Sequence, residues 1–180
     1  MSITLESIRD ALSLVIDPNT GKDLLTTKSA KNIQIDGTNV SLDVELGYPA
    51  RSQIELMRAA VTTALSSMQG VGRVSVNVYA KIVAHSAQRG VKLLPNVRNI
   101  IAVASGKGGV GKSTTAANLA LALAAEGANV GLLDADIYGP SQPMMLGVSG
   151  KPDSKDGKTM EPLEAHGLQI ASIGFMIDPD

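Results

Sequence analysis

The sequence predicts a small α+β module of the order α-β-β-α-β, followed by the first part of an α/β domain built on a parallel sheet. In residues 1–84, helical spacing of apolar residues and strand-like alternation follow one another in that order. After residue 97, an apolar run, a glycine-rich loop, a helical segment and a second apolar run are typical of a strand–helix–strand unit. Residues 85–97 have neither pattern and predict a linker between domains at 1–84 and 98–180.

Composition limits the classes of function. The 180 residues include 16 basic and 17 acidic side chains, and this balance gives no electrostatic reason to expect a nucleic-acid partner. Cysteine is absent, so this chain by itself offers neither a disulfide nor a thiolate metal site. No apolar run approaches the ~18 residues of a membrane span, and the N-terminus lacks the basic start and apolar block of a secretory signal. We therefore expect a cytoplasmic protein with no membrane partner.

The first module begins with a helix. Apolar residues recur there at spacings of three and four, at Leu5, Ile8, Leu12 and Val15. The Asp-Pro-Asn stretch at 17–19 ends this helix. Alternation over 33–35 and 40–46, on either side of an Asp-Gly turn, predicts a hairpin. Apolar spacing over 52–67 predicts a second helix, and alternation over 74–78 predicts a third strand.

The second half has the pattern of buried parallel strands. Residues 100–104 are all apolar, which predicts a strand buried on both faces of a parallel sheet. A helix is expected over 112–126, and a second buried strand over 129–133. The chain after residue 138 is rich in glycine and proline and predicts a loop. A third strand is expected over 168–175.

A phosphate-binding motif lies between the first strand and the helix of this half. Gly106–Ser113 satisfies the pattern G-x-x-x-x-G-K-[ST] at every fixed position, directly after a predicted buried strand. The glycines let backbone N–H groups surround a phosphate, and the helix N-terminus adds its positive dipole end. The Lys112 amine can reach the β- and γ-phosphates, and the Ser113 hydroxyl can ligate Mg²⁺. The candidate nucleotide-binding residues are Gly106, Lys107, Gly108, Gly109, Val110, Gly111, Lys112, Ser113 and Thr114.

The lysine at the start of this loop indicates which class of P-loop NTPase the motif resembles. Lys107 followed by Gly-Gly-Val-Gly-Lys-Ser-Thr resembles the deviant Walker A loop of P-loop NTPases that form nucleotide-sandwich dimers. The resemblance implies a homodimer in which Lys107 acts as a catalytic residue on the partner's phosphates. A solvated surface lysine is the alternative interpretation.

Two carboxylates follow the second predicted strand. Asp134 and Asp136 lie at its carboxyl end, beside the expected phosphate position. We expect Asp136 to position the attacking water and Asp134 to stand in the outer shell of the metal. Alternatively, one of the pair only caps the following turn.

The two halves together resemble one family. The Asp17-Pro18 pair, the hairpin and the Val44–Ala50 segment resemble the small MIP18-like domain of iron–sulfur assembly proteins. That domain joined to a deviant Walker A ATPase is similar to the Mrp/ApbC family of iron–sulfur cluster carriers, as is the switch-like segment Asp134–Ser141 followed by Pro143. The resemblance implies an ATP-hydrolysing, Mg²⁺-dependent carrier whose partners are a scaffold and recipient apoproteins.

The sequence departs from this family in two respects. The small domain often has a cysteine just after its Pro-Ala pair, whereas Arg51 and Ser52 stand here. Family members also continue past this length, through a Walker B aspartate and a C-x-x-C pair that ligates the cluster. The resemblance thus implies a C-terminally truncated chain. Whether this chain hydrolyses ATP by itself stays open.

Other interpretations stay open at this point. A positioning or partition ATPase of the same superfamily is one, and a nonenzymatic nucleotide-binding fragment is another. Asp17, Glu45 and Tyr48 lie in the best-matching segments of the small domain. They form either a transfer or partner surface, or simply a helix stop and hairpin packing.

Overall fold

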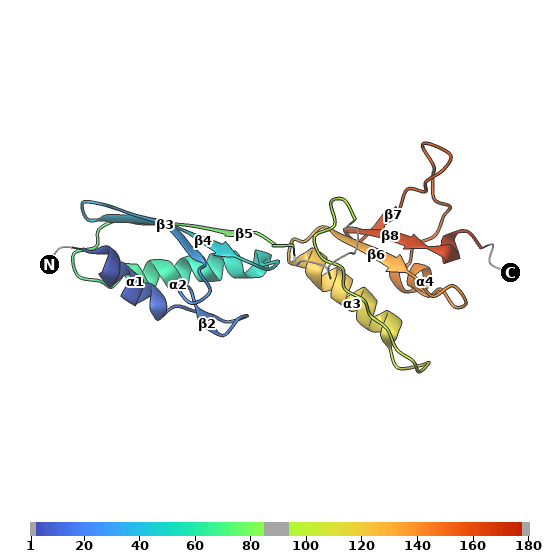
Figure 1. The fold of residues 1–180 in the computed structure, drawn as a ribbon, viewed down its shortest axis with the longest axis horizontal. Helices are drawn as coiled ribbons and strands as arrows, with labels where there is room; N and C mark the ends of the chain where they lie inside the picture. Colours follow the sequence, from blue (N-terminus) through green and yellow to red (C-terminus); the bar gives the residue numbers. More distant parts are fainter. Residues whose placement is uncertain (1–2, 85–93, 178–180) are drawn as a thin grey trace. The chain divides into compact units, whose positions relative to one another are not determined.

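The computed structural model describes residues 3–84 and 94–177, and it divides into two units, Met1–Asn99 and Ile100–Asp180. Each unit has its own core, and Figure 1 shows the elements of each. Residues 85–93, most of the predicted linker, lie outside the described part. Asn99 belongs to the first unit because its side chain and that of Arg98 donate to the carbonyls of Val83 and Ile82, at 3.2 and 3.1 Å.

The first unit begins with the predicted helix, α1, which spans Leu5–Ser13. Thr4 caps it, since its hydroxyl accepts the Ser7 N–H while the Ser7 hydroxyl accepts the Thr4 N–H. Ile8 and Leu12 are fully buried, as their spacing predicted. The short strands β1 (Ile16–Asp17) and β2 (Lys22–Asp23) follow as a small hairpin. Two-residue strands are too short to produce a periodic signal, and the sequence did not predict them.

A three-stranded sheet of order β3-β4-β5 forms the centre of this unit. The strands β3 (Ala30–Asp36) and β4 (Asn39–Leu46) form the predicted antiparallel hairpin, with Gly37 at a φ of 61° in the turn. β5 (Val74–Ala80) pairs parallel to β4, which a right-handed crossover through α2 permits. The carboxyl ends of β4 and β5 therefore lie at the same edge of the sheet.

The helix α2 (Ile54–Ser66), preceded by the 3₁₀ turn η1 (Arg51–Gln53), covers the sheet. Its Met57, Val61 and Leu65 are buried, at the helical spacing that the sequence predicted. They pack with the inward-facing positions of β4, which are Val40, Leu42, Val44 and Leu46.

The second unit contains α3 (Lys112–Ala125), β6 (Val130–Asp134) and β8 (Leu168–Ser172), as the pattern predicted. β6 and β8 pair in parallel. The structure adds α4 (Gln142–Leu146), β7 (Leu163–Ala165), which pairs antiparallel to β8, and the 3₁₀ turn η2 (Ile173–Phe175). The sheet order is β6-β8-β7, so this sheet is mixed rather than purely parallel.

The core of the second unit is small. It is formed by Ala117, Ala120, Leu146, Leu168, Ile170 and Phe175, contributed by α3, α4, β8 and η2. The alanines let α3 approach the sheet closely, and the Gly127 backbone, at a φ of 92°, follows the end of the helix.

Two expectations for this unit are wrong. Residues 100–104 do not form a strand, and Ile100 is 74% exposed. No described strand pairs with them, so their backbone groups have no ladder partners and their side chains no second layer. β6 is not buried on both faces either, because Leu133 is 72% exposed. Along β6, half-buried residues alternate with exposed ones, so one face of the strand is covered less than the other.

The packing of α2 generates a stability prediction. Leu65→Ala removes a fully buried side chain and is expected to destabilise the first unit by about 2–5 kcal/mol. Leu56→Ala on the same helix, where the leucine is 63% exposed, should change stability by less than about 0.5 kcal/mol. Tyrosine fluorescence during urea unfolding measures both, since tryptophan is absent and Tyr138 of the second unit is already fully exposed. Equal midpoints for the two variants would contradict the proposed core.

Candidate functional site

The phosphate-binding loop runs from Gly106 to the start of α3. Gly109 and Gly111 adopt φ values of 75° and 84°, in the left-handed region that favours glycine. A Cβ at either position would meet nothing within 4 Å, so the constraint comes from the backbone conformation rather than from crowding. Gly111 is the N-cap of α3 and has no side chain with which to cap the first turn. The first N–H groups of α3 are therefore left for a bound anion.

Lys112 and Asp136 come together across 24 residues of sequence. The Lys112 Nζ donates to Asp136 Oδ2 at 3.2 Å, and the two side chains are about one third exposed. Asp136 Oδ1 also accepts the Gly139 N–H at 3.1 Å. The hydrogen bond from Lys112, followed by that from Gly139, lowers the pKa of Asp136 below its ordinary value. The ammonium group that the motif directs at phosphate is thus paired with a carboxylate.

Asp134 connects three elements. Its Oδ2 accepts the N–H groups of Ser141 and Gln142, both at 3.0 Å, and the Ser172 hydroxyl at 3.3 Å. Its Oδ1 accepts the Asp136 N–H at 3.2 Å. The carboxylate therefore caps α4 and ties the ends of β6 and β8 together. Oδ1 has one acceptor position left for a donor such as a metal-bound water.

Gln142 and Ser141 are site residues that the sequence analysis missed. Gln142 is buried, and its Nε2 donates to the Ser113 carbonyl at 3.0 Å, which joins α4 to the first turn of α3. Ser141 Oγ and Gln142 Oε1 are buried without a partner among the described residues. Ser at the N-cap, Pro143 in the first turn and Gly147 at a φ of 64° past the end were the available signals for this helix.

Lys107 stands apart from these contacts. Its N–H donates to Ser105 Oγ at 3.1 Å, and the Ser105 hydroxyl donates to its carbonyl at 2.9 Å. Its ammonium makes no ion pair with any described residue of this chain. In the described part, no three His, Cys, Asp or Glu side chains lie close enough to hold a metal ion.

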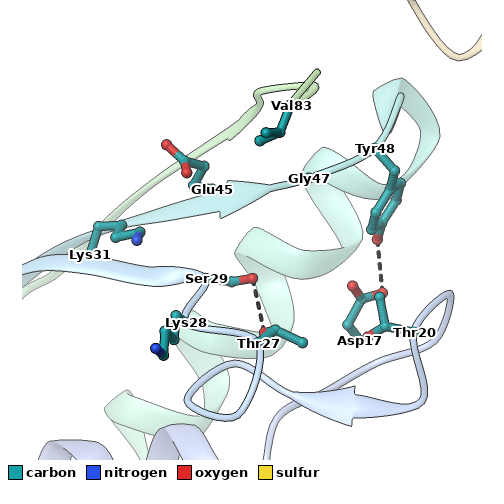
Figure 2. Close-up of a pocket in the computed structure, with 10 residues that line it drawn as sticks. All are labelled: Asp17, Thr20, Thr27, Lys28, Ser29, Lys31, Glu45, Gly47, Tyr48 and Val83. Atoms are coloured by element: carbon teal, nitrogen blue, oxygen red, sulfur yellow. Dashed lines mark hydrogen bonds between the residues drawn. The ribbon is translucent and has the colours of Figure 1, made fainter. Parts of the chain in front are cut away.

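A second polar site lies in the first unit. Asp17 and Tyr48, separated by 31 residues, meet there, with the Tyr48 hydroxyl donating to Asp17 Oδ1 at 2.8 Å. They line a pocket of about 350 Å³ with Glu45 (Figure 2). The three residues left open by the sequence thus share one pocket. Asp17 is almost fully buried there, and Glu45 pairs with Lys81.

Comparison with known protein families covers both halves of the chain. Residues 5–78 match the family described as iron–sulfur cluster assembly protein, and residues 96–180 match the family described as NUBPL iron-transfer P-loop NTPase. Each half of the chain is thus similar to one of these two families. The resemblance predicted from the sequence is confirmed at the level of both domains.

The chain is also similar to curated proteins that are named iron–sulfur cluster carrier protein. The chain is 41% identical over 182 residues to an iron–sulfur cluster carrier protein of Synechocystis, covering 99% of this chain and 52% of the relative. It is 56% identical over 117 residues to one of Pseudomonas fragi, covering 64% and 41%, and 40% identical over 164 residues to one of Escherichia coli K12, covering 91% and 44%. The chain spans about half the length of the curated relatives it matches.

One solved structure is similar to part of this chain. A solved structure titled as a domain of unknown function, DUF59, from Bacillus anthracis matches 41% of this chain and 72% of its own chain, with 21% identity and a TM-score of 0.39. No helix among the described residues is long and apolar enough to cross a membrane.

The Lys112–Asp136 contact makes a prediction about pH. Because the pKa of Asp136 is lowered, the ion pair is complete above the ordinary aspartate pKa and is lost as pH falls through the lowered value. In Lys112→Gln the pKa of Asp136 is expected to rise toward its ordinary value. Carboxyl ¹³C chemical shifts followed against pH measure it. Lys107→Gln is the matched control and should leave that pKa in place, since Lys107 makes no contact with Asp136.

Proposed function

We propose that this chain is part of an ATP-binding and ATP-hydrolysing iron–sulfur cluster carrier that binds clusters and transfers them to apoproteins. The observation that supports it most is the approach of Lys112 to Asp136 beside a glycine loop at the start of α3. That arrangement suits a nucleoside triphosphate. The curated relatives, each named iron–sulfur cluster carrier protein, supply the cargo. The partners are a scaffold and recipient apoproteins, and the compartment is the cytoplasm.

The phosphate site works by exchanging one anion for another. The Lys112 ammonium donates to Asp136 Oδ2 at 3.2 Å. A triphosphate seated on Gly106–Thr114 competes for that ammonium, and the Asp136 carboxylate is then released. Once free, the carboxylate is available to accept a hydrogen bond from the attacking water, which is the catalytic role proposed for it.

Ser113 in the first turn of α3 and Asp134 at the end of β6 fit a magnesium ion. The Ser113 hydroxyl and the free acceptor position of Asp134 Oδ1 are hard oxygen donors, the type that Mg²⁺ prefers. Ser113 would hold the ion directly and Asp134 through a water. When bound, the ion neutralises charge on the phosphates. Because Asp134 also holds the first N–H groups of α4, its position depends on that helix.

Lys107 is proposed to act in a homodimer. Its ammonium has no ion-pair partner in the described part of its own chain, so it is available to a second molecule. Bridging two chains through the triphosphate lets hydrolysis separate them again, which is a population shift between dimer and monomer.

Calorimetric titration of Mg²⁺-ATP tests the phosphate site. The native chain is expected to bind saturably, and Lys112→Ala to bind at least about tenfold more weakly, because a charge-assisted hydrogen bond is lost. Lys107→Ala is the matched control, since it also removes one ammonium of the loop but should keep single-chain affinity. Saturable binding that Lys112→Ala leaves unchanged would refute the proposed site.

Dilution tests the role of Lys107. Light scattering after size exclusion is expected to detect an ATP-dependent dimer of the native chain that dissociates on dilution. Lys107→Ala should remain monomeric at every concentration with ATP bound. If the longer protein hydrolyses ATP at a rate per chain that does not fall with dilution, action across a dimer is wrong. Retained nucleotide affinity without turnover in this chain favours the nonenzymatic fragment.

A further inference from the structure

The pocket of the first unit has a side that can accept a hydrogen bond and a side that can bind an anion. Ten residues line it: Asp17, Thr20, Thr27, Lys28, Ser29, Lys31, Glu45, Gly47, Tyr48 and Val83. Figure 2 shows the lysines on one side and the Asp17–Tyr48 pair on the other, with the Thr27 and Ser29 hydroxyls between them. These residues come from β1 and the turn after it, from the segment before β3 and the start of β3, from the end of β4 and the residues after it, and from the segment past β5. A pocket at the carboxyl ends of two parallel strands is a favourable position for a ligand.

The Asp17 side can accept a hydrogen bond from a ligand. Asp17 is 2% exposed, and its Oδ1 already accepts the Tyr48 hydroxyl and the Asn19 N–H, at 2.8 and 2.9 Å. No described group donates to its Oδ2. Oδ2 is not one of the buried side-chain oxygens that lack a partner among the described residues, so it keeps some accessible surface and can accept an N–H or O–H group that a ligand brings.

The lysine side requires an anion. Neither Lys28 nor Lys31 makes an ion pair with a described residue, although both line the pocket. The Glu45 carboxylate, which also lines the pocket, pairs with the Lys81 ammonium at 3.3 Å and accepts the Tyr79 hydroxyl at 3.2 Å. Lys28 also adopts a φ of 56°, a conformation uncommon outside glycine and asparagine. Its backbone is held there by the hydrogen bond from its N–H to the Leu25 carbonyl at 2.9 Å.

We propose that this pocket binds a short acidic segment of a partner polypeptide, with a side-chain carboxylate on Lys28 and Lys31 and a main-chain N–H on Asp17. A small inorganic anion would satisfy the lysines but would leave the Asp17 oxygen without a donor and facing a like charge. An acidic peptide supplies both a carboxylate for the lysines and a main-chain N–H group for Asp17. The pocket volume, about 350 Å³, suits a few residues rather than a single ion. The inference names a partner class for the proposed carrier and in that respect rests on the proposed function.

Fluorescence anisotropy of a labelled peptide tests the lysine side. The probe is a five-residue peptide of alternating glycine and glutamate, titrated with the 180-residue chain at low salt without nucleotide. Binding is expected to be saturable and to weaken at least about tenfold when glutamine replaces glutamate. The double variant Lys28→Gln/Lys31→Gln should lose binding to the same extent. Arg9→Gln/Arg73→Gln removes the same charge at exposed positions outside the pocket and should retain it.

The Asp17 side has its own test. A probe with N-methylated glycines has the same charge but no main-chain N–H at those positions, and it should bind several-fold more weakly to the native chain. No binding of the acidic probe, or equal loss in the two double variants, would overturn the proposal. So would equal affinity for the methylated probe. If the native chain bound the peptide but not Mg²⁺-ATP, the result would count against the proposed phosphate site and leave the pocket supported. Absent peptide binding alongside intact cluster transfer by the longer protein would count only against the pocket.

Discussion

Parallel strand pairing is the constraint on which both candidate sites depend. In the first unit β4 and β5 run parallel, and in the second unit β6 and β8 do so. Parallel strands require a crossover connection, and they bring their carboxyl ends to one edge of the sheet. The polar pocket lies at the end of β4, and Asp134 and Ser172 end β6 and β8. In each unit, residues far apart in sequence therefore meet at a strand edge, where backbone groups and side chains remain accessible to a ligand.

The edge of the second unit contains one carboxylate that holds neighbouring elements together, Asp134, and one whose main partner is a lysine, Asp136. Asp134 holds α4 and β8 through Oδ2, whereas Asp136 accepts the partly exposed Lys112 ammonium and the Gly139 N–H. A partly exposed ion pair of this kind contributes little to stability. It is consequently easy to exchange for a phosphate contact, while the Asp134 network keeps the surrounding loop in place. The division of labour between the two aspartates follows from their hydrogen bonds and not from their chemical type.

Local patterns in the sequence were sufficient to predict the elements whose interaction partners lie near them in the chain. Helical spacing identified α1 and α2, α3 was identified by the glycine loop before it and Gly127 after it, and the Asp-Gly turn identified the β3–β4 hairpin. The glycine motif identified the phosphate loop. Contacts between distant segments left no such signal: the Tyr48–Asp17 bond spans 31 residues, and the Gln142–Ser113 bond spans 29. The apolar run at 100–104 was misassigned because apolar character predicts burial only where a neighbouring strand and layer exist.

The phosphate loop keeps its backbone conformation although no strand precedes it in this structure. In P-loop domains a buried strand directly precedes the loop, yet here residues 100–104 are unpaired and exposed while Gly109 and Gly111 still adopt left-handed conformations. The conformation is fixed from the other side: α3 packs on β6 and β8, and Gln142 holds the Ser113 carbonyl of its first turn. The helix end and its lysine are thus positioned by the second unit's own core. The part of the loop nearest residue 105 depends only on the Ser105–Lys107 hydrogen bonds. Phosphate contacts made by α3 should therefore tolerate disorder in 100–104 better than contacts made by Lys107.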